Sequence, residues 1–186
     1  MAMASENYRA ARDFLLEHRE NYDKAVAEFR WPDITGRWNW ATDYFDGYAR
    51  GNDKTALWIV EEDGSEEKFT FAEMVTRSDK LAAWLTEQGL GKGDPVILML
   101  NNQVELWDAM LAIMKIGGVI MPTTTALQAA DLADRVARAG AKAVIANPVD
   151  TGKFYRIAET DPQVTLMSVG DGGPGWTDMR AAQDRA

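Results

Sequence analysis

Residues 106–127 read LWDAMLAIMKIGGVIMPTTTAL, and this stretch decides the fold class. It begins as an apolar segment, breaks at two glycines (117–118), and continues as a short apolar run that stops at Pro122. Glycine commonly ends a helix, and a short apolar run between turn signals is typical of a buried strand. Asp108 and Lys115 interrupt the segment well before the ~20 apolar residues that a membrane span needs. The stretch therefore predicts a core helix, a glycine turn, a buried strand and a loop.

The same alternation of helix and strand continues on both sides of this stretch. The apolar runs expected to form buried strands are 95–100, 119–121, 141–147 and 164–169, and the segments expected to form helices are 70–89, 103–118, 127–140 and 151–162. A last helix is expected to begin near Trp176. Strands and helices that alternate over short connections predict right-handed βαβ units. The expected fold class is therefore α/β, with a mostly parallel sheet covered by helices.

Two local signals precede the first of these strands. Residues 56–71 contain two β-prone runs around Asp63 and Gly64, a pattern that predicts a β-hairpin. Thr70 and Glu73 follow with the Thr-x-x-Glu spacing of a helix capping box. We therefore expect the hairpin to lead directly into a helix.

The start of the chain has a different character, and we expect residues 1–55 to form a helical, Trp-rich extension to an α/β portion at 56–186. The apolar spacing over 6–29 predicts a helix, broken at most once. An aromatic cluster follows, and it lacks the interleaved basic residues of a nucleic-acid platform. We expect it to pin the extension to the α/β portion; its members are Trp38, Trp40, Tyr44, Phe45, Tyr48 and Trp58.

Composition excludes several classes of partner. The formal net charge is −9, and such an acidic surface disfavours nucleic acids and anionic membranes. The chain contains no cysteine, which fits a reducing compartment, and its first residues lack the apolar run of a signal peptide. We expect a cytoplasmic protein without a membrane span. His18, the single histidine, lies among charged residues and is expected on the solvated surface.

Neutral polar residues follow three of the predicted strands. Asn101 and Asn102 come after the first, Pro122 and three threonines (Thr123, Thr124 and Thr125) after the second, and Asn147 after the third. Ligands of open α/β sheets bind outside the carboxyl ends of the strands, whereas Asn and Thr also cap helices. Capping is the expected role of the asparagines, and for the threonines both roles remain open.

The residues alone name no reaction. Residues 170–175, GDGGPG, contain a G-x-G-x-x-G spacing, but they follow the fourth predicted parallel strand and not the first, so a linker loop is expected there. The sequence also contains no Walker-type loop and no Gly-x-Ser-x-Gly elbow. No residue is assigned a catalytic or metal-binding role on these grounds.

A set of motifs in a fixed order resembles the N-terminal region of AMP-forming acyl-CoA synthetases, in the acetyl- and medium-chain branch of the adenylate-forming superfamily. The motifs are WNWATDYFD (38–46), KFTFAEM (68–74), GLGKGDPVILML (89–100), ELWDAMLAIMKIGGVIMPTTT (105–125), DLADRVARAGAKAVIA (131–146) and GW (175–176). The resemblance covers nearly the whole chain.

The resemblance implies a parent protein that uses ATP, Mg²⁺ and CoA to convert a carboxylate into an acyl-adenylate and then into a thioester. The family's phosphate loop and catalytic lysine are expected beyond residue 186, so the chain is expected to be a catalytically silent N-terminal portion that self-associates through uncovered surface. Thr123, Thr124 and Thr125 are the residues expected near the ligand crevice. The alternative interpretation is a self-contained flavodoxin-like ligand-binding or protein-interaction domain without enzymatic activity.

Overall fold

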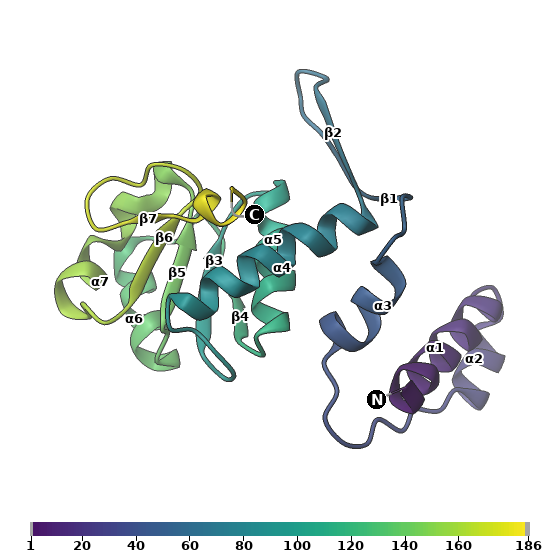
Figure 1. The fold of residues 1–186 in the computed structure, drawn as a ribbon. Coiled ribbons are helices and arrows are strands. Elements are labelled where there is room, and N and C mark those ends of the chain that lie inside the picture. The colour runs from purple at the N-terminus through teal and green to yellow at the C-terminus, as the bar shows by residue number, and fades with distance from the viewer. Residues whose placement is uncertain (1, 185–186) are drawn as a thin grey trace. The chain divides into compact units, whose positions relative to one another are not determined.

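A computed structural model of the chain describes residues 2–184 and divides into two compact units, one that ends at Tyr48 and one that starts at Ala49 (Figure 1). The domain boundary expected at residue 55 stays a prediction.

The first unit is helical. Helix α1 (Ala2–Glu17) is followed by α2 (Tyr22–Glu28), the π-helix η1 (Trp40–Phe45) and the single turn α3 (Asp46–Ala49), which crosses into the second unit. The segment expected as one helix with at most one break is therefore two helices. The break is stabilised by Asn21, whose side chain accepts a hydrogen bond from the backbone N–H of Lys24 at 3.1 Å and so caps α2.

Aromatic side chains pack the interior of this first unit. The ring of Tyr8 lies 5.4 Å from the ring of Trp38 and 4.7 Å from that of Tyr44, and Trp40 stacks on Phe45. Edge-on and offset contacts of this kind add to the stabilisation that burial provides. These residues hold the extension together internally, and their expected role in pinning it to the α/β portion stays a prediction.

The expected surface position of His18 is wrong. Its ring stacks on Phe14 with centroids 4.5 Å apart, and the residue is only 9% exposed. The two residues are separated by one helical turn, so their side chains lie on the same face. The charged residues next to it in the sequence are exposed, so they gave no sign that His18 itself is buried.

The hairpin and the helix after it are confirmed. Strands β1 (Thr55–Val60) and β2 (Glu66–Thr70) pair antiparallel, and Gly64 at the turn adopts a φ of 83°. Helix α4 (Phe71–Glu87) starts with the predicted capping box. The Glu73 N–H donates to Thr70 Oγ1 at 3.1 Å, and the Thr70 N–H donates to Glu73 Oε2 at 2.7 Å.

The second unit contains a five-stranded sheet, and every neighbouring pair of strands in it is parallel. The strands are β3 (Pro95–Met99), β4 (Val119–Pro122), β5 (Ala143–Ala146), β6 (Thr165–Ser168) and β7 (Thr177–Asp178), in the spatial order β4-β3-β5-β6-β7. This result confirms the α/β fold class. The order is that of flavodoxin-like doubly wound sheets.

The helix expected near Trp176 is a wrong prediction. Thr177 and Asp178 pair with β6 as strand β7, and the chain then forms the short 3-10 helix η3 (Met179–Ala182). The side chain of Asp178 accepts a hydrogen bond from the Arg180 N–H at 2.8 Å and begins that turn. Strand pairing with β6 overrides the helical preference of this segment.

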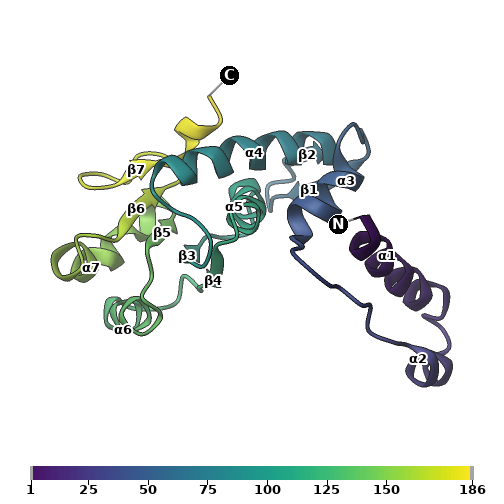
Figure 2. The ribbon, with the colours of Figure 1, turned by 60° about the horizontal axis from the view of Figure 1, so that its bottom comes forward.

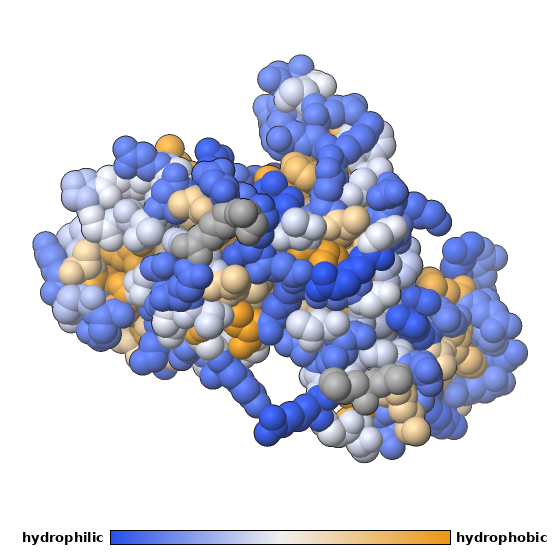
Figure 3. Space-filling view, viewed as in Figure 1, coloured by the Kyte–Doolittle hydropathy of each residue, from blue (hydrophilic) through white to orange (hydrophobic). Residues whose placement is uncertain are grey.

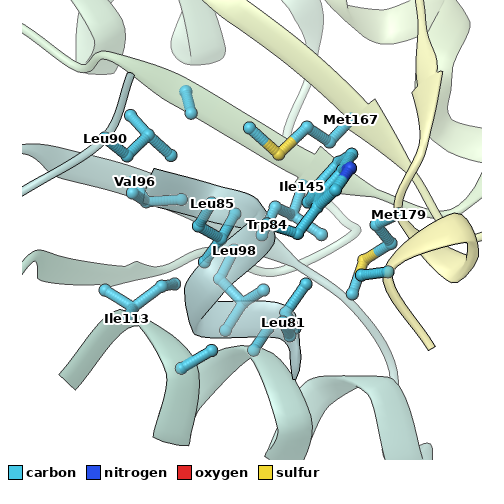
Figure 4. Close-up of a cluster of buried hydrophobic side chains, with 14 of the residues drawn as sticks. Leu81, Trp84, Leu85, Leu90, Val96, Leu98, Ile113, Ile145, Met167 and Met179 are labelled. Carbon is cyan, nitrogen blue, oxygen red and sulfur yellow. The ribbon is translucent and has the colours of Figure 1, made fainter. Parts of the chain in front are cut away.

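Helices cover both faces of the sheet. Helices α4 and α5 (Val104–Lys115) lie on one face, and α6 (Ala129–Ala139), the 3-10 helix η2 (Pro148–Phe154) and α7 (Tyr155–Thr160) lie on the other (Figure 2). The side chains of β3 alternate, so Val96 and Leu98 face α4 and α5 while Ile97 and Met99 face α6. Figure 4 shows the first of these cores, in which Trp84 and Leu85 of α4 lie close to the strands.

Candidate functional site

The carboxyl ends of β3 and β5 form the topological switch point of the sheet, where the connections leave toward opposite faces. The two strands are neighbours in the sheet, yet β3 leads into α5 on one face and β5 leads into η2 and α7 on the other. In doubly wound sheets such a switch point leaves a crevice between the departing loops, and ligands bind there. This edge is therefore the candidate site.

A chain of polar side chains crosses this switch point. Asn147, after β5, donates from Nδ2 to Gln103 Oε1 at 2.9 Å, and Gln103 donates from Nε2 to Glu105 Oε2 at 3.0 Å. Arg180 of η3 donates from Nε and Nη2 to Glu105 Oε1 at 3.2 and 3.1 Å. None of these contacts is predicted from the sequence. The contacts of Asn147 with Gln103 and of Arg180 with Glu105 join residues 44 and 75 positions apart, and no local pattern signals such pairs.

Glu105 is the anionic centre of this chain of side chains. Burial of its side chain favours the neutral acid, but hydrogen bonds from Gln103, its own backbone and Arg180 outweigh that effect and lower the pKa of Glu105 below its usual range. The residue also lies in the first turn of α5, where the helix dipole favours negative charge. Glu105 is therefore ionised at neutral pH.

The asparagines do not cap helices as expected. The N-cap position of α5 belongs to Gln103, with no capping hydrogen bond from its side chain. Asn102 instead accepts a bond from Trp107 Nε1 at 3.4 Å. Asn147 occupies the N-cap position of η2, but its side chain does not cap the turn because the amide is directed to Gln103. The carboxyl edge thus contains charged groups as well as the neutral ones predicted.

The three threonines after β4 have different environments. Thr123 is 7% exposed, and its hydroxyl donates to the backbone oxygen of Met121 at 3.0 Å. Thr124 is exposed, and its hydroxyl accepts a bond from the Ala126 N–H at 3.3 Å. The backbone oxygen of Thr125 accepts a bond from Lys153 Nζ at 2.5 Å, which ties this loop to η2. Ligand contact by these residues stays a prediction.

The loop GDGGPG is a connection between strands, as the sequence analysis expected. It joins β6 to β7, so a strand follows it where a pyrophosphate site needs the start of a helix. The hydroxyl of Ser168 donates to the backbone oxygen of Gly170, and the Gly170 N–H donates to Asp178 Oδ1 at 2.9 Å. A Cβ on Gly172 would lie only 2.5 Å from Ser168 Oγ, so the loop is packed tightly against the end of the sheet.

A buried ion pair lies between the helices of the α4–α5 face. Arg77 of α4 binds both carboxylate oxygens of Asp108, at 3.0 Å from Nε and 2.6 Å from Nη2, and the Asp108 side chain is 1% exposed. Burial raises the pKa of Asp108, and the bonds from Arg77 oppose that rise. In the sequence, Asp108 stands out only as an interruption of an apolar stretch. The pair joins two packed helices, so we assign it a structural role.

Residues 2–184 hold no group of three or more His, Cys, Asp or Glu side chains arranged to bind a metal ion. In the same part of the chain, no helix combines the length and the apolar character that crossing a membrane requires.

Comparison with known proteins assigns most of this chain to a family. The family model for AMP-binding enzymes matches residues 45–184. The chain is 31% identical over 132 residues to an uncharacterized acyl-CoA ligase, YtcI, of Bacillus subtilis, and 28% identical over 172 residues to the human mitochondrial acyl-coenzyme A synthetase ACSM1. The two alignments cover 71% and 85% of this chain but only 25% and 30% of those proteins.

A solved structure agrees with these relatives. An acyl-CoA synthetase of Brucella canis superimposes with a TM-score of 0.74 at 27% identity, over 89% of this chain and 32% of that one. The strand order alone is shared with flavodoxin-like domains, but the family match covers both the sheet and the hairpin before it. The chain therefore belongs to the family of AMP-binding enzymes.

Proposed function

We propose that the protein containing these residues is an ATP-dependent, AMP-forming acyl-CoA ligase. It joins a carboxylate to ATP as an acyl-adenylate with release of pyrophosphate, and CoA then displaces AMP to form a thioester. The observation that carries the proposal is the family match over 45–184, with acyl-CoA ligases and synthetases among the relatives. The compartment we propose is the cytoplasm, because the sequence contains no cysteine.

In this proposal the present residues supply one wall of the substrate crevice. The switch point between β3 and β5 faces the crevice, and the loop with Thr123, Thr124 and Thr125 lies beside it. Transfer of a nucleotidyl group needs cationic groups and Mg²⁺ on the phosphates. The described residues offer no carboxylate cluster for the metal, so we assign Mg²⁺ and phosphate binding to other parts of the ligase.

Two enzyme assays test this function. The product of the complete gene, incubated with ATP, Mg²⁺, CoA and a panel of short, medium-chain and aromatic acids, is expected to release pyrophosphate only when an acid is present. The 186-residue chain in the same assay is expected to be silent. Absence of acid-dependent pyrophosphate from the complete product would refute the ligase proposal, and turnover by the chain alone would refute its silence.

We also propose that the isolated chain self-associates. The face in Figure 3 is mostly hydrophilic with separate hydrophobic areas. Large apolar side chains are nevertheless exposed on the hairpin, at Trp58 and Val60, and on the edge strand β4, at Val119. Exposed apolar residues beside an unpaired strand edge favour association. Sedimentation velocity should show oligomers that increase with concentration, and a single monomeric species at high concentration would contradict the proposal.

A further inference from the structure

The hydrogen bonds that link Arg180, Glu105, Gln103 and Asn147 at the switch point can run in only one direction from donor to acceptor. An ionised carboxylate accepts hydrogen bonds and cannot donate them. Glu105 uses Oε1 for the guanidinium of Arg180 and Oε2 for the side-chain amide of Gln103. Gln103 must therefore turn its NH₂ group toward Glu105, and its carbonyl oxygen points the other way.

This constraint passes to Asn147. The carbonyl oxygen of Gln103 can only accept a bond, so Asn147 must present its NH₂ group there, as the 2.9 Å contact from Nδ2 shows. Two hydrogen-bonding groups of the Asn147 side chain then remain, Oδ1 and the second N–H of Nδ2, and Oδ1 accepts no hydrogen bond from residues 2–184. The side chain is only partly buried and lies at the N-cap of η2, at the edge of the switch point.

We propose that Arg180, Glu105 and Gln103 form a directional relay that fixes Asn147 as a hydrogen-bond acceptor in the crevice between β3 and β5. Oδ1 of Asn147 then receives a hydroxyl or N–H group of a substrate at this point of the crevice. The proposal rests on the proposed function, because it takes this edge as the substrate crevice. Arg180, Glu105 and Gln103 act as positioning residues, and only Asn147 touches the substrate.

The direction of the relay can be reversed without removing its ion pair. In the double variant Glu105→Lys/Arg180→Glu, the new ammonium group donates to the carbonyl oxygen of Gln103. The Gln103 amide must then turn its NH₂ group toward Asn147, and Asn147 must turn its own NH₂ group into the crevice. A relay that served only to hold the fold together would be restored by this exchange of charges, whereas a directional relay is inverted.

Hydrogen exchange of the side-chain amides, measured by NMR on the ¹⁵N-labelled chain, shows whether the NH₂ group of Asn147 is the group that bonds to Gln103. In the unsubstituted chain the Asn147 NH₂ is hydrogen-bonded and protected, and in the double variant we expect it to exchange about tenfold faster. The matched control is Asp134→Arg/Arg138→Asp, which swaps an exposed ion pair on α6 and should leave the Asn147 signals unchanged. An Asn147 amide unprotected in the unsubstituted chain, or equally protected in the double variant, overturns the relay.

Two further measurements test the relay, one with a second variant and one with a ligand. Should the double variant fail to fold, Gln103→Leu removes the acceptor of the Asn147 amide and should also speed its exchange about tenfold, and unchanged exchange overturns the relay. Titration with adenosine, which offers hydroxyl and N–H groups, should shift the Asn147 amide signals. Unshifted signals overturn the proposed ligand class. Failure of the ligase assay alone would refute the proposed function and leave the exchange result standing.

Discussion

The amino and carboxyl ends of the parallel sheet are built in different ways. At the amino end the backbone makes the connections, because the Gly93 N–H donates to the Gly117 oxygen and the Val119 N–H to the Asp94 oxygen, each at 2.9 Å. The carboxyl end has backbone bonds too, such as the one from the Thr123 N–H to the Leu98 oxygen at 2.9 Å, but here side chains add further connections, as in the contact between Asn147 and Gln103. Backbone contacts between neighbouring turns form a rigid base, whereas side chains can exchange partners with a ligand. The comparison suggests that one end serves stability and the other serves binding.

The strongest test of the amino end is Gly118→Val. A Cβ at Gly118 would lie 3.0 Å from Ile113 Cγ2 and 3.3 Å from the backbone oxygen of Asp94. A branched side chain cannot fit there without displacing the core, so the free energy of unfolding should fall by about 3 kcal/mol. Chemical denaturation measures it. The control Gly152→Val sits where a Cβ meets no atom within 4 Å, and an equal loss in both variants would remove the special role of the amino end.

Gly172→Ala tests whether the carboxyl end also has a rigid part. The added Cβ would lie 2.5 Å from Ser168 Oγ and 2.7 Å from Trp176 Cβ. The loop must move away from β6, so we expect a loss of about 2 kcal/mol, smaller than that of Gly118→Val because a loop yields more easily than a helix turn. Gly91→Ala, whose nearest contact would be at 4.0 Å, is the matched control in denaturation experiments. A neutral result would show that the loop is free to move.

Gln103→Ala tests the side-chain part of the carboxyl end. It leaves the Asn147 amide and one oxygen of Glu105 without their partner, but both groups are only partly buried and water can replace it. The expected loss in the free energy of unfolding is about 1 kcal/mol. In the complete ligase the same change should reduce kcat/KM far more than its stability cost suggests. A loss of stability above that of Gly118→Val would make Gln103 a structural residue and reverse the comparison.

Sequence predicted local features better than contacts between distant segments, and the reason is physical. The paired glycines at the amino end of the sheet and the capping box of Thr70 and Glu73 act within a few residues, so their spacing alone predicts the turn and the helix start. The contact of Glu105 with Arg180 depends on where β7 places a residue 75 positions away. The surface position predicted for His18 is wrong for the same reason, and the burial of Asp108 was not predicted, because both depend on packing that their neighbours in sequence do not reveal.

The smallest expected effect concerns pH and Glu105→Gln. The pKa of Glu105 is lowered in the folded chain, so the unfolded chain binds the proton more readily as the pH falls. The stabilisation by the ionised Glu105 is therefore present above the usual glutamate pKa of about 4.3 and is lost as the pH falls through the lower folded value. Because Arg180 is largely exposed, the stabilisation should stay below about 1 kcal/mol.

The measurement compares the free energy of unfolding of the unsubstituted chain and Glu105→Gln between neutral pH and pH 3. Asp108, on the same helix, has a raised pKa and contributes the opposite slope, with stability lost as the pH rises through its folded value. The curve of either chain alone mixes the two residues, whereas the difference between the chains cancels most of the Asp108 contribution. A difference that shrinks toward acid pH supports an ionised Glu105 at the centre of the carboxyl end. A difference independent of pH would mean that the charge of Glu105 does not stabilise the carboxyl end. Packing alone would then set the orientation of the Gln103 side-chain amide.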